Sequence, residues 1–186
     1  MAVSLMTAGC GNNNSILNKG VKALKNEDYS LAVDRFEEMI KAETNENPKN
    51  EKQEKIQSNN LAEAYKGLGM AYFELKDYDK ALDSYIKCDE LEGRKTPSMY
   101  RNMALCAQES KEYASAAEYA EKGIDLIEKN EESEEPEIKK DLYLIIIQSL
   151  ESDGNWKEAL EWAKAYNERF PEDKDVEKEI MFLETR

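Results

Sequence analysis

Four copies of one short pattern constrain the fold more than any other feature of this chain. Each copy has a polar residue, then an aromatic residue, and then an alanine three residues after the aromatic. The copies run from Glu27 to Ala32, from Lys76 to Ala81, from Lys111 to Ala116 and from Gly154 to Ala159. Such recurrence is typical of arrays in which one small structural unit is stacked on the next.

Each alanine also has partners at fixed distances along the sequence. Four residues after it lies Phe36, Tyr85, Ala120 or Ala163, and twelve residues before it lies Gly20, Gly69, Ala104 or Ile147. A spacing of four places two residues on one face of a helix. The upstream residue then falls on a preceding helix, across a tight turn that contains the aromatic residue. Small residues let two helices approach to roughly 8–10 Å, so the pattern predicts a helical hairpin.

The second copy carries six residues of a known repeat at the expected places, namely Tyr65, Leu68, Gly69, Tyr72, Ala81 and Tyr85. It resembles the tetratricopeptide repeat (TPR), a helix-turn-helix unit of roughly 34 residues. The resemblance implies an all-α fold, a right-handed α-solenoid of about four hairpins closed by a C-terminal capping helix. The predicted repeats span about residues 14–44, 60–93, 97–128 and 139–171, within a domain of residues 16–186.

Spacing between the turn aromatics is irregular, with intervals of 49, 35 and 43 residues. The extra residues fall at about 44–57 and 129–137, which we interpret as longer helix ends and loops. Ile147 replaces the expected small residue, so the fourth hairpin is predicted to be splayed or shifted. After Pro171, Val176, Ile180 and Leu183 share one helical face. They predict a capping helix over 172–185 that covers the last apolar surface.

In the family that this chain resembles, the first helices of successive repeats line a concave groove that binds an extended peptide or a partner helix. The residues at these places are Leu17, Val21, Leu24, Lys66, Met70, Phe73, Arg101, Leu105, Gln108, Leu144 and Gln148. The resemblance implies a ligand with apolar anchors, and with a carboxylate that meets Lys66 or Arg101. In the alternative, the apolar members of this set only pack against neighbouring helices.

Composition argues against several other functions. The net charge is −14, from 40 acidic and 26 basic residues, whereas nucleic-acid binding needs a basic surface. The chain has no histidine, which removes the commonest general base and a common metal ligand. The acidic run Glu131 to Glu137 lacks the alternating ligands and central glycine of a calcium loop. We therefore expect no cofactor, no metal and no catalysis, and we interpret Cys88 and Cys106 as buried small apolar residues.

The start of the chain, residues 1–15, resembles the end of a bacterial lipoprotein signal peptide. Ala8 and Gly9 precede Cys10 behind a short apolar run, and a polar tract follows. In that family the cysteine is lipidated. The resemblance therefore implies that this chain contacts a membrane only through a lipid anchor at Cys10, and that residues 11–15 form a flexible tether. Thr7 stands where a branched aliphatic is usual, and the apolar run is short. We therefore predict a signal peptide that begins before Met1.

Together these features predict a non-catalytic scaffold or adapter that binds another protein or a peptide in the TPR groove. The predicted location is extracytoplasmic, on a bacterial membrane surface. The alternative is a cytoplasmic TPR co-chaperone or regulatory module whose N-terminus is disordered. An enzyme that uses the repeats as a platform is a third alternative, but the sequence offers no nucleophile–base pair for it. No oligomeric state is predicted.

Overall fold

The computed structural model describes residues 9–91, 94–129 and 136–186, with side chains from Ser15 onward. All regular structure in these ranges is helical, which confirms the predicted all-α fold class. The helices are α1 (Gly9–Lys25), α2 (Tyr29–Thr44), α3 (Glu51–Glu74), α4 (Tyr78–Glu90), α5 (Pro97–Glu109), α6 (Tyr113–Lys129), α7 (Pro136–Ser152), α8 (Trp156–Arg169) and α9 (Asp175–Leu183). No helix in the described ranges is both long and apolar enough to cross a membrane.

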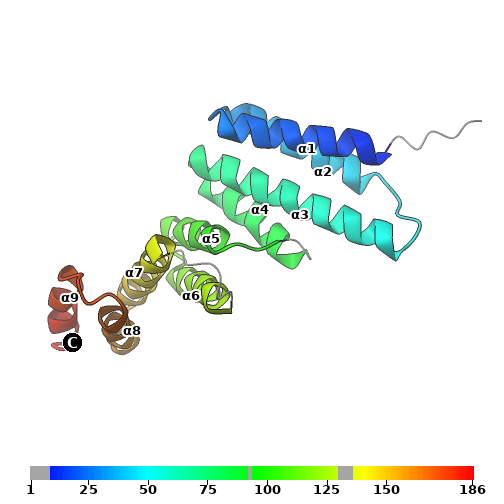
Figure 1. Cartoon of the computed structure of the whole chain (residues 1–186). Coiled ribbons are helices and arrows are strands. Elements are labelled where there is room, and N and C mark those ends of the chain that lie inside the picture. Colours follow the sequence, from blue (N-terminus) through cyan, green and yellow to red (C-terminus); the bar gives the residue numbers. More distant parts are fainter. Residues whose placement is uncertain (1–8, 92–93, 130–135) are drawn as a thin grey trace, which may run out of the picture. The chain divides into compact units, whose positions relative to one another are not determined.

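The helices group into two compact units. The first, Met1–Lys95, holds α1 to α4, and the second, Thr96–Arg186, holds α5 to α9. Within each unit every helix packs against the next along the chain (Figure 1). Two contacts skip a helix, because α1 touches α3 in the first unit and α5 touches α7 in the second. The first helices of neighbouring hairpins therefore lie side by side within each unit.

The recurring sequence pattern marks four turns with the same backbone conformation. Glu27, Lys76, Lys111 and Gly154 each lie two residues before the turn aromatic, and each has a positive φ, between 59° and 79°. In the first turn the Glu27 amide donates to the Leu24 carbonyl at 3.0 Å, and the Asp28 amide donates to the Ala23 carbonyl at 3.0 Å. These are the two hydrogen bonds of a Schellman C-cap, and the other three turns repeat them. The chain thereby reverses direction within a few residues.

The residue after the positive-φ position can cap the next helix. The Asp28 side chain caps α2 by accepting a hydrogen bond from the Leu31 amide at 3.2 Å. Four residues after the turn alanine of this copy, Phe36 is fully buried beneath Gly20 and Gly67. A Cβ atom at Gly20 would lie 2.7 Å from the Phe36 ring. The small upstream residue and the downstream aromatic are thus one packing contact, as the spacing predicts.

The fourth hairpin departs from the others at Ile147. This side chain is buried in the core of the second unit, where the other copies have glycine or alanine. Of the four hairpins, α7 and α8 have the least extensive contact with each other. A branched side chain holds two helices further apart than glycine does, so the splaying or shift of this hairpin stays a prediction.

At the two ends of the chain the structure also bears on the predicted segments. The backbone of α1 is already helical at Gly9, so residues 11–15 continue a helix instead of forming the flexible tether predicted there. At the other end, α9 buries Val176 and Leu183 against the second unit, whereas Ile180 is half-buried. These are the three residues of the predicted capping face.

Candidate partner-binding groove

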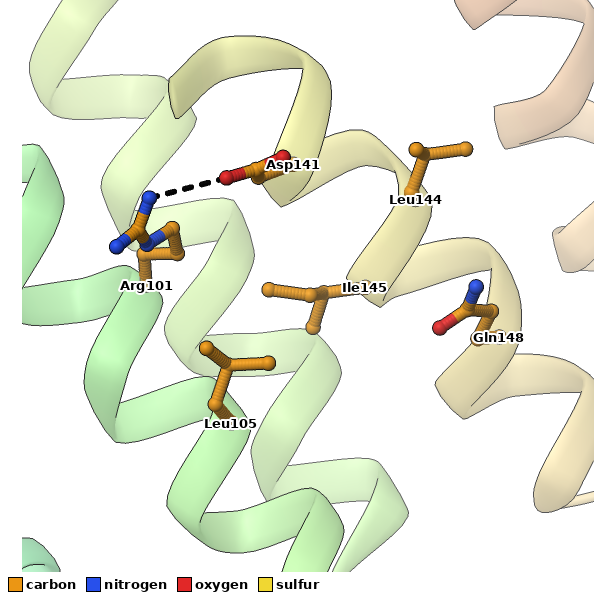
Figure 2. Close-up of a pocket in the computed structure, with 6 residues that line it drawn as sticks. All are labelled: Arg101, Leu105, Asp141, Leu144, Ile145 and Gln148. Atoms are coloured by element: carbon orange, nitrogen blue, oxygen red, sulfur yellow. Dashed lines mark hydrogen bonds and ion pairs between the residues drawn. The ribbon is translucent and has the colours of Figure 1, made fainter. Parts of the chain in front are cut away.

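A groove lies between α5 and α7, wholly inside the second unit. Its lining residues are Arg101, Leu105, Asp141, Leu144, Ile145 and Gln148, and its volume is about 390 Å³ (Figure 2). That is near the lower end of ligand pockets in proteins, which span roughly 300–1,000 Å³. Four of the six lining residues belong to the predicted groove set: Arg101, Leu105, Leu144 and Gln148.

Helical periodicity places these side chains in two facing rows. Arg101 and Leu105 are one turn apart on α5, and Asp141, Ile145 and Gln148 follow one another by about one turn on α7. Figure 2 shows Arg101 and Asp141 facing each other at one end, with Leu105 and Ile145 between the helices. The groove therefore has a charged end, an apolar middle and an amide, that of Gln148, further along α7.

The charged end is an ion pair on the groove rim. The Arg101 Nη1 atom lies 3.0 Å from the Asp141 Oδ2 atom. The Arg101 side chain is 31% exposed and that of Asp141 is 50% exposed, so the pair is partly open to water. Exposed pairs of this kind contribute little to stability, about 0–1 kcal/mol. The main effect of the pair is to offset the charge of Arg101.

Gln108, also in the predicted set, has a different role. Its amide nitrogen donates to the Ser149 hydroxyl at 3.0 Å and to the Ile145 carbonyl at 3.4 Å. Ser149 is completely buried on α7. Gln108 thus ties α5 to α7 below the groove and does not line it. The tie fixes the distance between the two helices that form the groove walls.

The remaining predicted residues lie on α1 and α3 of the first unit. Val21 and Met70 are exposed, at 38% and 44%, whereas Leu17 and Leu24 are partly buried and pack against the core of that unit. The Phe73 ring packs edge-on against Tyr78, with the ring centres 5.8 Å apart. Lys66 is held at Nζ by the Glu63 carboxylate at 2.7 Å and by the Arg94 carbonyl at 3.2 Å. Leu17 and Leu24 thus pack against the core of the first unit, as in the alternative that the sequence left open for the apolar residues of the set.

Asp141 and Ile145 line the groove but are missing from the sequence prediction. A signal was available, since Asp141 and Ile145 are three residues before Leu144 and Gln148, respectively, on the same helix. The prediction used only the positions at which the family lines its groove, and it left out their neighbours on the same helical face. Asp141 matters most, because it neutralises a cation that the sequence assigned to the ligand.

Other titratable groups lie outside the groove. Burial raises the pKa of the Cys88 thiol to about 11, and Cys88 and Cys106 are both buried, as the sequence predicts. Burial, and next the neighbouring Glu179 carboxyl, raise the pKa of Glu151 to about 7. Across the described ranges, no three cysteine or carboxylate side chains gather as metal ligands do. Most of the acidic run, Glu131–Glu135, lies outside the described residues, and so does the side chain of Cys10.

Comparison with known proteins agrees with this architecture. Residues 62–88 match the sequence profile of the tetratricopeptide repeat, which covers α3 and α4 in part. The photosystem I assembly protein Ycf3 of Prochlorococcus marinus is 34% identical in one strain, over 87 residues that make up 47% of this chain and 43% of that protein. This chain therefore spans less than half the length of the curated relatives that it matches.

Solved structures extend the likeness to most of the chain. YrrB, described as a TPR protein with an unusual peptide-binding site, superposes with a TM-score of 0.65 over 87% of this chain and 70% of its own, at 17% identity. The apo form of RapI superposes with a TM-score of 0.64 over 92% of this chain and 60% of its own, at 10% identity. At these identities the likeness shows the fold alone. Residues 62–88 are thus similar to one tetratricopeptide repeat, and the fold of most of the chain is like that of these solved structures.

Proposed function

We propose that this chain is a non-catalytic adapter that binds a peptide or a partner helix in the groove between α5 and α7. One observation carries the proposal: a TPR hairpin pair presents an open groove of about 390 Å³ with an apolar middle and polar ends. Apolar anchors flanked by a few polar groups are the usual composition of a recognition site. The peptide-binding site named for YrrB and the assembly role named for Ycf3 are consistent with it.

Affinity capture with groove variants tests this proposal. The double variant Arg101→Glu, Leu105→Asp reverses the charged end and places a carboxylate in the apolar middle. A matched control, Lys157→Glu, changes charge in the same sense at a side chain of α8 that is 90% exposed. We expect one protein to be recovered by the parent chain and the control but lost with the double variant. Thermal melting of all three chains checks that loss of binding is not loss of fold.

Recovery of the same proteins by all three chains would show that binding lies outside the groove. The proposal would then fail even if those proteins were genuine partners. If only the double variant melts early, a Gln148→Glu variant replaces it, because Gln148 is exposed on the groove rim and its substitution leaves the core unchanged.

We further propose that the adapter is held at an extracytoplasmic membrane surface through a lipid on Cys10. The support is the sequence Ala8, Gly9, Cys10 behind a short apolar run. Expression from the natural start codon with an alkyne fatty acid tests it. We expect label on the parent chain and none on a Cys10→Ser variant. An unlabelled parent chain in the soluble fraction would instead favour the cytoplasmic module.

A further inference from the structure

Among the helices that the structure describes, α1 alone has a net positive charge. It contains Lys19, Lys22 and Lys25 and no acidic residue, in a chain whose net charge is −14. In each of the other described helices, acidic residues equal or outnumber basic ones. The helix dipole favours Lys22 and Lys25 in the last turn, but it accounts neither for Lys19 nor for the lack of acidic residues.

The three lysines form an exposed face of α1, which we call the lysine face. Successive members are three residues apart, so each is turned by about 60° from the one before, and the row covers about 9 Å of the helix axis. All three residues are exposed, whereas Ile16 and Ala23 are buried in the core of the first unit. One side of α1 thus packs on α2 and α3, and the lysine face is turned to solvent.

The charges of the lysine face are not neutralised by the described part of the chain. None of its three side chains has an ion pair or a hydrogen bond within the described ranges. By contrast, the Nζ atom of Lys66 on α3 lies 2.7 Å from the Glu63 carboxylate. At physiological ionic strength a charge more than about 8 Å away is largely screened. The field at the lysine face therefore follows these lysines more than the net charge of the whole chain.

The composition of the lysine face indicates which anionic partner fits it. Protein interfaces are rich in aromatic residues, methionine and arginine and poor in lysine, and the exposed apolar residue nearest this face in the sequence is a single valine, Val21. Duplex DNA binding typically engages about six to ten phosphates, more than three lysines can neutralise. A surface of anionic lipid headgroups needs neither apolar anchors nor arginine forks, because each lysine attracts it as a point charge.

Resting on the proposed location at a membrane surface, we propose that the lysine face of α1 lies on anionic lipid headgroups and adds an electrostatic contact to the lipid anchor. The sequence implied a membrane contact through Cys10 alone. A single acyl chain gives only marginal, reversible binding, and a basic patch is a common second signal. Each lysine near an anionic surface strengthens binding roughly fivefold.

Vesicle binding of a chain that carries one acyl chain tests this contact. Cys88 and Cys106 are buried, so a maleimide that bears one myristyl chain is directed to Cys10. Mass spectrometry verifies that a single chain is attached, and a Cys10→Ser chain is the uncoupled control. Because the acyl chain is attached chemically, the test does not depend on lipidation of Cys10 in cells, which the alkyne label measures separately.

Two triple variants separate the lysine face from net charge. The test variant carries glutamine in place of Lys19, Lys22 and Lys25, since glutamine and lysine have similar helix propensities. The matched control carries glutamine in place of three lysines of the second unit that are 68–90% exposed, Lys157, Lys174 and Lys178. Each variant loses three positive charges from −14, so both have a net charge of −17. Thermal melting checks that both remain folded.

The expected result depends on the lipid and on salt. On vesicles that contain phosphatidylglycerol, at about 0.1 M salt, the parent and the matched control should bind alike and the test variant at least roughly tenfold more weakly. On phosphatidylcholine vesicles the three coupled chains should bind alike. At about 1 M salt the Debye length falls to about 3 Å, so the difference on anionic vesicles should disappear.

Three outcomes would overturn this inference. Equal binding of the three chains to anionic vesicles would show that the lysine face makes no lipid contact. Equal weakening of both triple variants would show that only net charge acts. Unchanged vesicle binding, together with an acidic protein that the parent captures from cells and the test variant does not, would assign the lysine face to a protein instead of a membrane.

Discussion

Replacing Gly69 with alanine perturbs the contact that fixes the distance between α3 and α4. A Cβ atom at this position would lie 2.7 Å from two atoms of the Tyr85 ring, Cδ1 and Cε1, and Tyr85 is completely buried. Overpacking of a core contact costs roughly 1–3 kcal/mol, and alanine recovers about 1 kcal/mol of helix propensity relative to glycine. We expect Gly69→Ala to lower the free energy of unfolding by about 1 kcal/mol.

The third repeat suggests a background in which Gly69→Ala should raise the free energy of unfolding instead of lowering it. There Ala104 and Ala120, both fully buried, occupy the places of Gly69 and Tyr85, so a small residue faces a small residue. In a Tyr85→Ala background the ring is absent, and Gly69→Ala should then raise stability by about 1 kcal/mol. Urea unfolding followed by circular dichroism measures all four chains of this cycle. A stabilising effect of Gly69→Ala in the parent chain would refute the packing argument.

Three further results are expected. At the turns, Lys76→Gly should stabilise the chain by about 1 kcal/mol and Gly154→Ala should destabilise it by a similar amount in urea unfolding, because both positions have positive φ. Effects of the same sign for the two substitutions would contradict the turn assignment. Because Glu151 has a raised pKa in the folded chain, its stabilising contribution is present at acid pH and is lost as pH rises through about 7. Glu151→Gln should therefore raise stability by about 1 kcal/mol at about pH 8, after allowance for solvent screening, with little effect at about pH 4. Because Cys88 is buried with a raised pKa, a thiol reagent should label it at the rate of unfolding, and rapid labelling of the native chain would contradict its burial.

The fold was predictable because its signals are local and repeated. Each turn has a residue with positive φ at the same offset before the aromatic residue, and only the fourth uses glycine, so glycine alone would have missed three turns of four. The aromatic and the alanine that follow supplied the signal instead. The capping face of α9 was equally readable, because Val176 and Leu183 lie two helical turns apart.

The site was predictable only in part, because its charges depend on contacts between helices. Arg101 and Asp141 are 40 residues apart in the chain, and nothing in the local sequence of either indicates the other. Lys66 and Glu63 are one turn apart on α3, which is a readable pair, but a lysine on a predicted groove is easily assigned to the ligand. The family pattern therefore indicated four of the residues that line the groove and missed the carboxylate that offsets its arginine.

Photo-crosslinking tests the central claim most directly, because it reports contact at a chosen side chain. A benzophenone amino acid at Gln148 places the reactive group on the groove rim, and the same amino acid at Lys157 places it on an exposed face of α8. Irradiation in the native cells should join one partner protein to the chain through position 148 and none through position 157. Crosslinks of equal yield to the same protein from both positions, or from position 157 alone, would contradict partner binding in the groove.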